Sequence, residues 1–193
     1  MERGEMDPII KTNRNTLKQI PDWIDDKAFE NACFQYGVPD YIRDDINKDL
    51  NDEPTYTDLM TLLAKRHLKE LRYLEIGVSV GKNFFQMLNA MPSGIFTGFD
   101  IEEINPVLEK GLHPLSDRSW STFPGSIKKT DSSLKTYTYN GNTVNYLCGD
   151  VWDKESWSVL KGSKFNLIFS DALHSAEAIL FEFEMLVHND LLS

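Results

Sequence analysis

Basic residues, cysteines and long apolar runs are all scarce in this chain of 193 residues. Lysine and arginine number 20 against 30 aspartates and glutamates, which gives a formal net charge of −10. Nucleic acids and anionic membrane surfaces attract clustered basic side chains, so we expect neither as a partner. No apolar run approaches the length of a signal-peptide core or a membrane span. These shortages together predict a soluble, cytoplasmic protein.

The two cysteines, Cys33 and Cys148, stand far apart in the sequence and form no C-x-x-C pair. This spacing indicates neither a disulfide framework nor a zinc site. We therefore expect both thiols to be buried as small apolar side chains.

A short apolar run, a glycine turn and a helical pattern follow one another between residues 72 and 88. The run ends at Ile76 and is typical of a strand covered on both faces. Gly77 and Gly81 bracket the turn, where glycine lets a ligand approach the backbone and the next helix presents free N–H groups. Glu75 lies at the end of the strand, where its carboxylate can accept hydrogen bonds from a hydroxyl or ammonium group. The segment predicts the opening of a nucleotide-binding α/β unit.

Strand and helix patterns alternate along the rest of the chain. We expect an N-terminal helical extension over residues 1–54, which Pro21 and Pro39 break into short pieces, and an α/β domain over residues 55–193. Further strands are predicted at residues 95–100, 136–150 (two arms of a hairpin around Asn140-Gly141) and 164–171, and helices at residues 55–71, 82–88, 103–111 and from 176 onward. We expect residues 111–147 to be an insertion that consists of a long loop and the hairpin. This order predicts the α/β class with a largely parallel sheet.

Two helix signals make specific predictions. Thr55 and Asp58 resemble a capping box at the start of a helix. The last helix is predicted to be amphipathic, with its apolar face formed by Ile179, Leu180, Phe183 and Leu186.

An acidic residue closes each of the four predicted strands of the parallel sheet. These residues are Glu75, Asp100, Asp150 and Asp171. One aspartate in such a place is usually only a cap for the next helix. Ligands of open α/β sheets, however, lie outside the carboxyl ends of the strands, so four acids at these ends predict a ligand site.

The glycine turn distinguishes between cofactors. A dinucleotide fingerprint requires G-x-G-x-x-G, but Ser79 and Lys82 occupy the positions of the second and third glycines. The remaining pattern, acidic-x-Gly-x-x-x-Gly, resembles the first motif of class I S-adenosylmethionine (SAM)-dependent methyltransferases. The resemblance extends from about residue 55 to residue 190 and covers the N-terminal two-thirds of such an enzyme. It implies a Rossmann-like sheet of parallel strands with helices on both faces.

This resemblance assigns a role to each matching residue. The residues that match the first motif are Glu75, Gly77, Ser79 and Gly81, with Ser79 where many members have glycine. The match implies that Gly77 and its neighbours lie against the methionine moiety of SAM. Asp100 matches the acid that holds both ribose hydroxyls, while Asp150 and Val151 match residues at the adenine edge. Trp152 either stacks on the adenine or belongs to the core.

The segment Asp171-Ala-Leu-His174 resembles the D-x-x-H motif of metal-assisted sugar O-methyltransferases of the macrolide-tailoring type. The resemblance implies that Asp171 binds a divalent cation such as Mg²⁺ and that His174 takes a proton from the substrate hydroxyl. The implied function is O-methylation of a small-molecule or saccharide acceptor. The alternative is an aspartate cap and an incidental histidine at a helix start.

The sequence departs from that family after its fourth strand. The family's sheet has seven strands, and the acids that follow the fifth strand and complete the metal site have no counterpart here. We therefore expect a fold that is incomplete at the C-terminus and a 193-residue form that is inactive. The open edge of the fourth strand could pair with another chain, including a second copy in a homo-oligomer.

Two other functions remain open. An NAD(P)-binding Rossmann oxidoreductase or epimerase could use Asp100 to hold an NAD ribose, although the failed fingerprint and the lack of a Tyr-x-x-x-Lys pair count against it. A truncated, non-catalytic methyltransferase-like binding module would bind a partner through the open edge.

Overall fold

The computed structural model describes residues 3–29, 34, 37–112, 121–122 and 133–193. Contacts between residues divide the chain into two compact units, which we call the helical unit and the sheet unit. The helical unit consists of Met1–Lys69, Ser79–Pro92 and Ile104–Asp117, and the sheet unit consists of Glu70–Val78, Ser93–Glu103 and Arg118–Ser193. Each unit is therefore assembled from segments that are distant in the sequence. The expected domains, with a boundary at residue 54 and an insertion at 111–147, stay predictions.

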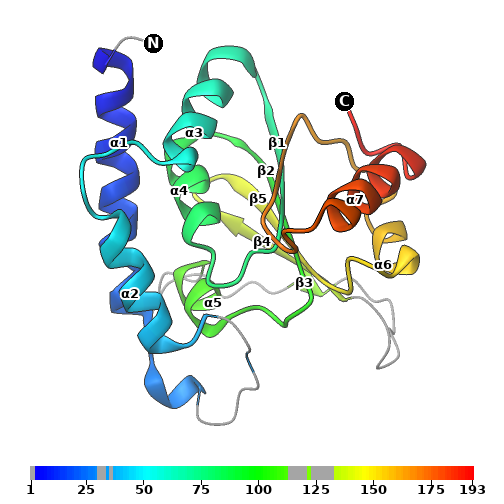
Figure 1. Cartoon of the computed structure of the whole chain (residues 1–193), viewed down its shortest axis with the longest axis horizontal. Coiled ribbons are helices and arrows are strands. Elements are labelled where there is room, and N and C mark those ends of the chain that lie inside the picture. The colour runs from blue at the N-terminus through cyan, green and yellow to red at the C-terminus, as the bar shows by residue number, and fades with distance from the viewer. Residues whose placement is uncertain (1–2, 30–33, 35–36, 113–120, 123–132) are drawn as a thin grey trace. The chain divides into compact units, whose positions relative to one another are not determined.

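The helical unit contains every described helix that precedes residue 113 (Figure 1). These are α1 (Arg3–Leu17), the 3-10 helices η1 (Ile20–Trp23) and η2 (Asp26–Phe29), α2 (Pro39–Asp49), α3 (Tyr56–His67), α4 (Lys82–Ala90) and α5 (Pro106–Leu112). Pro21 and Pro39 lie in the first turns of η1 and α2, where a missing N–H costs no helical hydrogen bond. The prediction of short pieces was wrong for α1, which is 15 residues long. Within the described ranges, no helix has both the length and the apolar content of a membrane-spanning segment.

Two apolar clusters stabilise the helical unit. The first joins the end of α1 to η1, α2 and α5, and its buried members are Leu17, Ile20, Ile42, Ile46, Val80 and Val107. The second joins α1 to α3, and its members are Met6, Ile9, Ile10 and Leu62. Because α1 contributes to both clusters, it connects the N-terminal part of the unit to the helices that follow.

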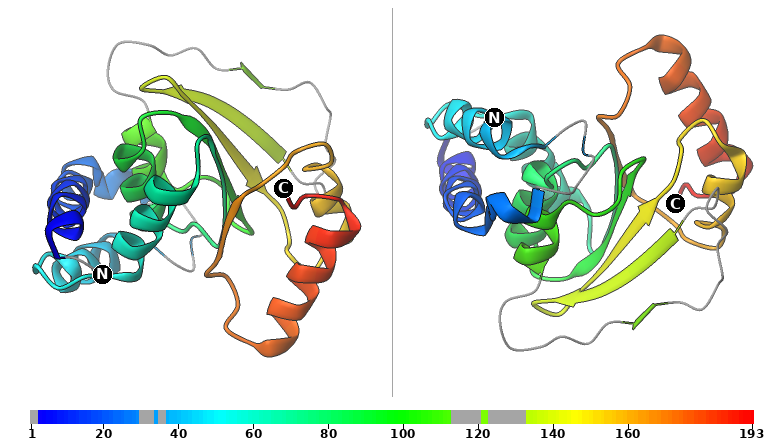
Figure 2. Two further views of the ribbon diagram at one scale, coloured as in Figure 1. Left: turned by 90° about the horizontal axis from the view of Figure 1, so that it is seen from above. Right: turned by 90° about the horizontal axis from the view of Figure 1, so that it is seen from below.

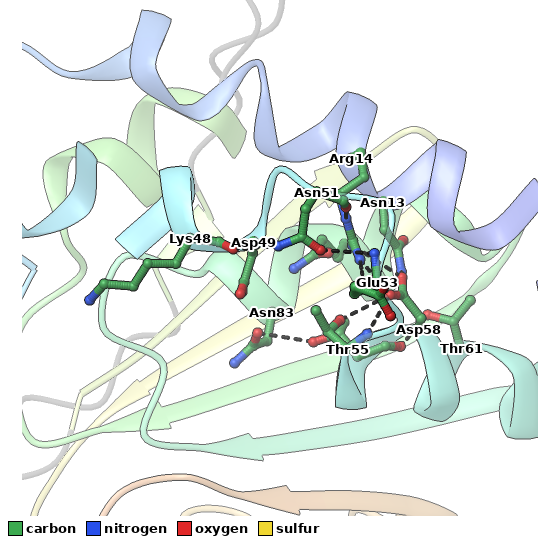
Figure 3. A network of polar contacts seen from close by, with 12 residues as sticks. Asn13, Arg14, Lys48, Asp49, Asn51, Glu53, Thr55, Asp58, Thr61 and Asn83 are labelled. Carbon is green, nitrogen blue, oxygen red and sulfur yellow. Dashed lines mark hydrogen bonds and ion pairs between the residues drawn. The ribbon is translucent and has the colours of Figure 1, made fainter. Parts of the chain in front are cut away.

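A buried ion pair also joins α1 to the start of α3 (Figure 3). Nη2 of Arg14 lies 2.8 Å from Oδ2 of Asp58, and both side chains are almost completely buried. The same guanidinium donates to the backbone carbonyls of Asn51 and Glu53, each at 2.8 Å. Asp58 accepts the backbone N–H of Thr55 at 2.8 Å, which confirms the predicted capping box. One arginine thus satisfies the oxygens of three positions in the loop and helix start.

In the described part of the sheet unit, six strands form one mixed sheet. They are β1 (Leu71–Ile76), β2 (Gly94–Asp100), β3 (Ser121–Thr122), β4 (Ser133–Tyr139), β5 (Asn142–Cys148) and β6 (Leu167–Ser170). The order across the sheet is β3-β4-β5-β2-β1-β6. Strands β5, β2, β1 and β6 are parallel. Beyond β5, β4 pairs antiparallel with β5, and β3 pairs antiparallel with β4 (Figure 2). The predicted α/β class with mostly parallel strands is confirmed.

The hairpin of β4 and β5 forms at the predicted turn. Asn140 and Gly141 have φ angles of 48° and 81°, and Tyr139 pairs with Asn142 across the turn. Two successive positive φ angles are typical of the tight hairpin turns that match the twist of the strands. The Asn-Gly prediction is confirmed.

The two faces of β1 have different surroundings. Leu74 and Ile76 belong to an apolar cluster with Trp157, which lies in α6 (Lys154–Ser158), and with residues of α7 (Ala176–His188). The Trp157 ring meets Phe99 of β2 edge-on, with the ring centroids 5.1 Å apart. Glu75 lies between Leu74 and Ile76 in the strand, so its side chain projects from the other face. Glu75 is therefore on the face of β1 opposite to the apolar cluster of the sheet unit.

The buried face of α7 differs from the predicted one. It consists of Ala178, Glu182, Met185 and Leu186. Ile179, Leu180 and Phe183 are 55%, 59% and 55% exposed, so the prediction that they share the buried face with Leu186 was wrong. Apolar side chains occupy two adjacent sides of this helix. The sequence pattern therefore could not specify which side packs on the sheet.

The thiol predictions have different outcomes. Cys148 is only half-buried, and its Sγ donates to the backbone carbonyl of Ile101 at 3.6 Å, so the expectation of full burial was wrong for this residue. Cys33 lies outside the described residues. Residues 113–120 and 123–132, which form most of the predicted long loop, lie outside them as well.

Candidate functional site

The four predicted acids lie at the carboxyl ends of four neighbouring strands. Glu75 is the penultimate residue of β1, and Asp100 is the last residue of β2. Asp150 follows β5 by two residues, and Asp171 comes directly after β6. Because β5, β2, β1 and β6 are parallel neighbours, these residues share one edge of the sheet unit.

Asp100 holds the backbone that follows β1. Its Oδ2 accepts the N–H of Val78 at 2.7 Å, and its Oδ1 accepts the N–H of Glu102 at 2.9 Å. The residue is only 8% exposed. A carboxylate oxygen has two acceptor sites, so the group can serve the loop and still accept hydroxyl donors from a ligand.

Glu75 is buried and carries a proton at neutral pH. Burial raises its pKa to about 8; the hydrogen bond from Tyr73 lowers the pKa, and the nearby Asp171 and Asp100 carboxylates raise it. The Tyr73 hydroxyl donates to Oε2 at 2.7 Å. Within the described part of the chain, Oε1 has no hydrogen-bond partner. A buried oxygen without a partner is costly, so Oε1 is available to a polar group of a ligand.

The turn after β1 requires glycine at position 77. Gly77 has a φ angle of 84°, and a Cβ there would lie 2.6 Å from both Cα and N of Ala172. Its N–H donates to the carbonyl of Phe99 at 2.8 Å, and the N–H of Asp171 donates to Ile76 at 2.7 Å. The absence of a side chain at Gly77 therefore leaves room for the segment after β6. The predicted reason for glycine here was room for a ligand against the backbone.

Ser79 and Gly81, the other predicted residues of the turn, belong to the helical unit. Ser79 has a φ angle of 49° and Gly81 one of 78°, and Gly81 precedes the first residue of α4. The left-handed region is uncommon for serine and ordinary for glycine. Position 79 thus has a backbone conformation that glycine would adopt without strain, although serine occupies it.

The residues after β5 form a turn at the surface. Asp150 is exposed, and its Oδ1 accepts the N–H of Trp152 at 2.9 Å. Val151 is 6% exposed, and its carbonyl accepts the indole N–H of Trp157 at 2.8 Å. Trp152 is 45% exposed and lies against Phe181, with ring centroids 5.1 Å apart. Of the two alternatives for Trp152, a fully buried core position is excluded.

Asp171 and His174 are near each other, but the contact does not fix the imidazole ring. Nε2 of His174 lies 3.9 Å from Oδ1 of Asp171, which is beyond hydrogen-bond distance, and the histidine side chain is 80% exposed. Ser175 caps α7 by accepting the N–H of Ala178, so His174 precedes the helix. In the parts of the chain that the structure describes, no group of three or more His, Cys, Asp or Glu residues could hold a metal ion.

Tyr73 and the backbone N–H of Val78 contribute to the site and were not predicted. The sequence carries a signal for Tyr73, because residues two apart in a strand share a face. A phenol two positions before a strand-terminal glutamate is therefore within reach of its carboxyl group. No pattern in the sequence indicates the N–H of Val78, since every residue except proline has one.

Comparison with models of protein families, with curated proteins and with solved structures gives no match to this chain.

Proposed function

We propose that this chain binds SAM and belongs to an enzyme that methylates a hydroxyl group of a small molecule or saccharide. The observation that carries the proposal is the arrangement of acids at the ends of β5, β2, β1 and β6, with Asp100 tied to the turn after β1. Chain order reverses at β1, because β2 pairs with one side of β1 and β6, the last described strand, pairs with the other side. In a Rossmann-like sheet, that switch point is where ligands bind.

The residues present fit the charge and the hydrogen-bonding groups of SAM. The ligand carries an ammonium and a sulfonium, both cationic, and the buried Oε1 of Glu75 has no partner among the described residues. A cation beside Glu75 would favour release of its proton and pairing with the carboxylate. Asp100 would accept the two ribose hydroxyls, and Asp150 with Val151 would border the adenine.

Methyl transfer needs little from the protein beyond alignment and removal of one proton. Bound SAM would supply an electrophilic methyl group, whose carbon–sulfur bond breaks as the acceptor oxygen bonds to the carbon. The acceptor hydroxyl would pass its proton to the imidazole of His174. The donor set around Asp171 does not fit a Mg²⁺ site within the described residues.

A non-catalytic binding module is the second candidate, and the exposure of His174 favours it. The 3.9 Å contact with Asp171 leaves the ring without a fixed orientation, whereas a general base must meet its proton in a defined geometry. An NAD(P)-linked enzyme is the third candidate, because a carboxylate such as Asp100 can also hold an NAD ribose.

Calorimetry with SAM, S-adenosylhomocysteine and NADH separates these candidates. We expect SAM to bind the wild-type chain, and Asp100→Asn to weaken it roughly ten-fold to a hundred-fold, because a hydrogen bond to a charged acceptor contributes about 1.5–3 kcal/mol. The control is Glu103→Gln, which also removes one negative charge, but from an exposed glutamate that pairs with Lys135. This variant should keep the SAM affinity of the wild type. Binding of NADH alone, or equal SAM affinity in both variants, would contradict the proposal.

A further inference from the structure

Large apolar side chains are exposed along one side of α7, the orange-red helix of the sheet unit in Figure 1, and no charged side chain lies among them. We call it the α7 stripe, and its members are Ile179, Leu180, Phe183 and Val187. Each of them is more than half exposed, at 55%, 59%, 55% and 54%. The intervals of three and four residues place these side chains side by side, over an arc of about 100° of the helix.

The α7 stripe is distinct from the buried face of the same helix. The buried residues pack on the sheet and on α6, whereas the stripe occupies the adjacent arc. Glu177, Glu184 and His188 are exposed and lie on the remaining arc, so no ionisable side chain interrupts the stripe. A monomer gains nothing from this pattern, because exposed apolar surface of this size raises the free energy of the chain in water.

We propose that the α7 stripe is the interface of a homodimer, in which two copies pack their α7 helices against each other about a two-fold axis. A two-fold interface places the same patch of both copies in contact, so a charge close to the axis would face the same charge of the partner copy. The chain has a net charge of −10, which makes most of its surface unsuitable for such a contact. The α7 stripe avoids this repulsion because it carries no charge.

The area of the α7 stripe agrees with what a small dimer requires. A large apolar side chain has about 200 Å² of surface, so four that are half exposed present roughly 400 Å² per copy. Homodimer interfaces are about 65% apolar, so an interface built around the stripe would cover roughly 600 Å² per copy. Two copies would bury about 1,200 Å², the lower limit of stable specific interfaces. We therefore expect a dissociation constant in the micromolar range.

Phe183 lies at the middle of the α7 stripe. Ile179 precedes it by one helical turn, and Val187 follows it by one turn, so a two-fold axis near the centre of the stripe brings Phe183 close to its copy. Large aromatic residues at the centre of an interface contribute most to affinity. The proposal makes Phe183 the residue whose substitution has the greatest effect on the dimer, and it does not depend on SAM binding.

Sedimentation equilibrium on the 193-residue chain tests the interface. The wild type should show a monomer–dimer equilibrium below ~100 µM, since small interfaces give micromolar affinities. Phe183→Glu should raise the dissociation constant at least about ten-fold, because it buries an unpaired charge in each copy. His188→Glu is the matched control: it adds one negative charge to the same helix outside the stripe and should leave the dimer intact.

Circular dichroism of each variant checks that the fold is kept, and Leu180→Glu provides a second substitution in the α7 stripe if Phe183→Glu does not fold. A wild type that remains monomeric over the whole concentration range overturns the proposal. A dimer that both stripe variants preserve overturns it as well.

Discussion

The hydroxyl of Tyr73 donates a hydrogen bond of 2.7 Å to the carboxyl group of Glu75, which is 1% exposed. Burial raises the pKa of Glu75 to about 8, compared with 4.5 in the unfolded chain. Between these values the folded protein holds a proton that the unfolded chain has released. The free energy of unfolding therefore falls as pH rises from about 4.5 to about 8, by up to about 1.4 kcal/mol per pH unit.

Glu75→Gln should remove this pH dependence, because glutamine keeps the shape of the protonated acid and does not ionise. Chemical denaturation at several pH values gives the free energy of unfolding of both proteins. As pH rises through that window, the free energy of unfolding of the variant should increase relative to that of the wild type. Burial also raises the pKa of Glu182. Because Glu182 is present in both proteins, its contribution to the pH dependence disappears when one free energy is subtracted from the other. A constant difference from pH 4 to pH 9 would show that Glu75 ionises normally in the folded state.

Arg14→Met should destabilise the protein by about 3–5 kcal/mol, since it leaves the Asp58 carboxylate buried without its cationic partner. Arg43→Ala is the control, because Arg43 pairs with Asp26 at an exposed position and such pairs contribute at most about 1 kcal/mol. Urea denaturation measures both. The double variant Arg14→Met with Asp58→Asn should recover part of the loss, and equal effects of the two arginine substitutions would contradict the role given to the buried pair.

Gly77→Ala should be far more damaging than Gly141→Ala. Both glycines have φ angles above 80°, so alanine costs about 1–2 kcal/mol in backbone strain at either position. A Cβ at Gly141 meets nothing within 4 Å, whereas at Gly77 it would lie 2.6 Å from the backbone of Ala172. The clash should add about 1–3 kcal/mol. Thermal unfolding of the two variants compares them, and similar melting temperatures would show that the segment after β6 moves aside easily.

His174→Ala tests the proposed general base. In a longer form of the enzyme that is active, the rate of S-adenosylhomocysteine formation with a panel of saccharide and small alcohol acceptors should fall about 10²–10⁴-fold, whereas SAM affinity should not change. His188→Ala removes an exposed histidine from the far end of α7 and should leave the rate unchanged. Turnover by the His174 variant at the wild-type rate would assign the proton transfer to another group.

The elements that the sequence predicted well are those with local causes. The Asn140-Gly141 turn and the Thr55–Asp58 cap depend on residues within three positions of each other, and both are confirmed. The strand–turn–helix segment from β1 to α4 also lies where the pattern placed it. Local backbone preferences and side-chain periodicity determine such features, so one sequence is sufficient to find them.

The features that the sequence did not reveal depend on distant partners. Arg14 and Asp58 are 44 positions apart, and nothing in either local pattern indicates the other. The exposure of Ile179 and Phe183 depends on which side of α7 meets the sheet, which is decided by packing. The same holds for the candidate site: the sequence located the acids at strand ends, but the protonation of Glu75 follows from burial in the folded unit.

The pairing of β1 with β6 has a consequence for the nascent chain. Tyr73 pairs with Leu167, so β1 leaves the ribosome long before the strand that completes its second edge. Until that strand arrives, the backbone N–H and C=O groups along this edge of β1 have only water to bind, and unpaired edges readily recruit other extended chains. Ribosome-bound chains that end between β5 and β6 should therefore associate with other extended chains through this edge of β1, and longer chains that include β6 should not do so at this edge.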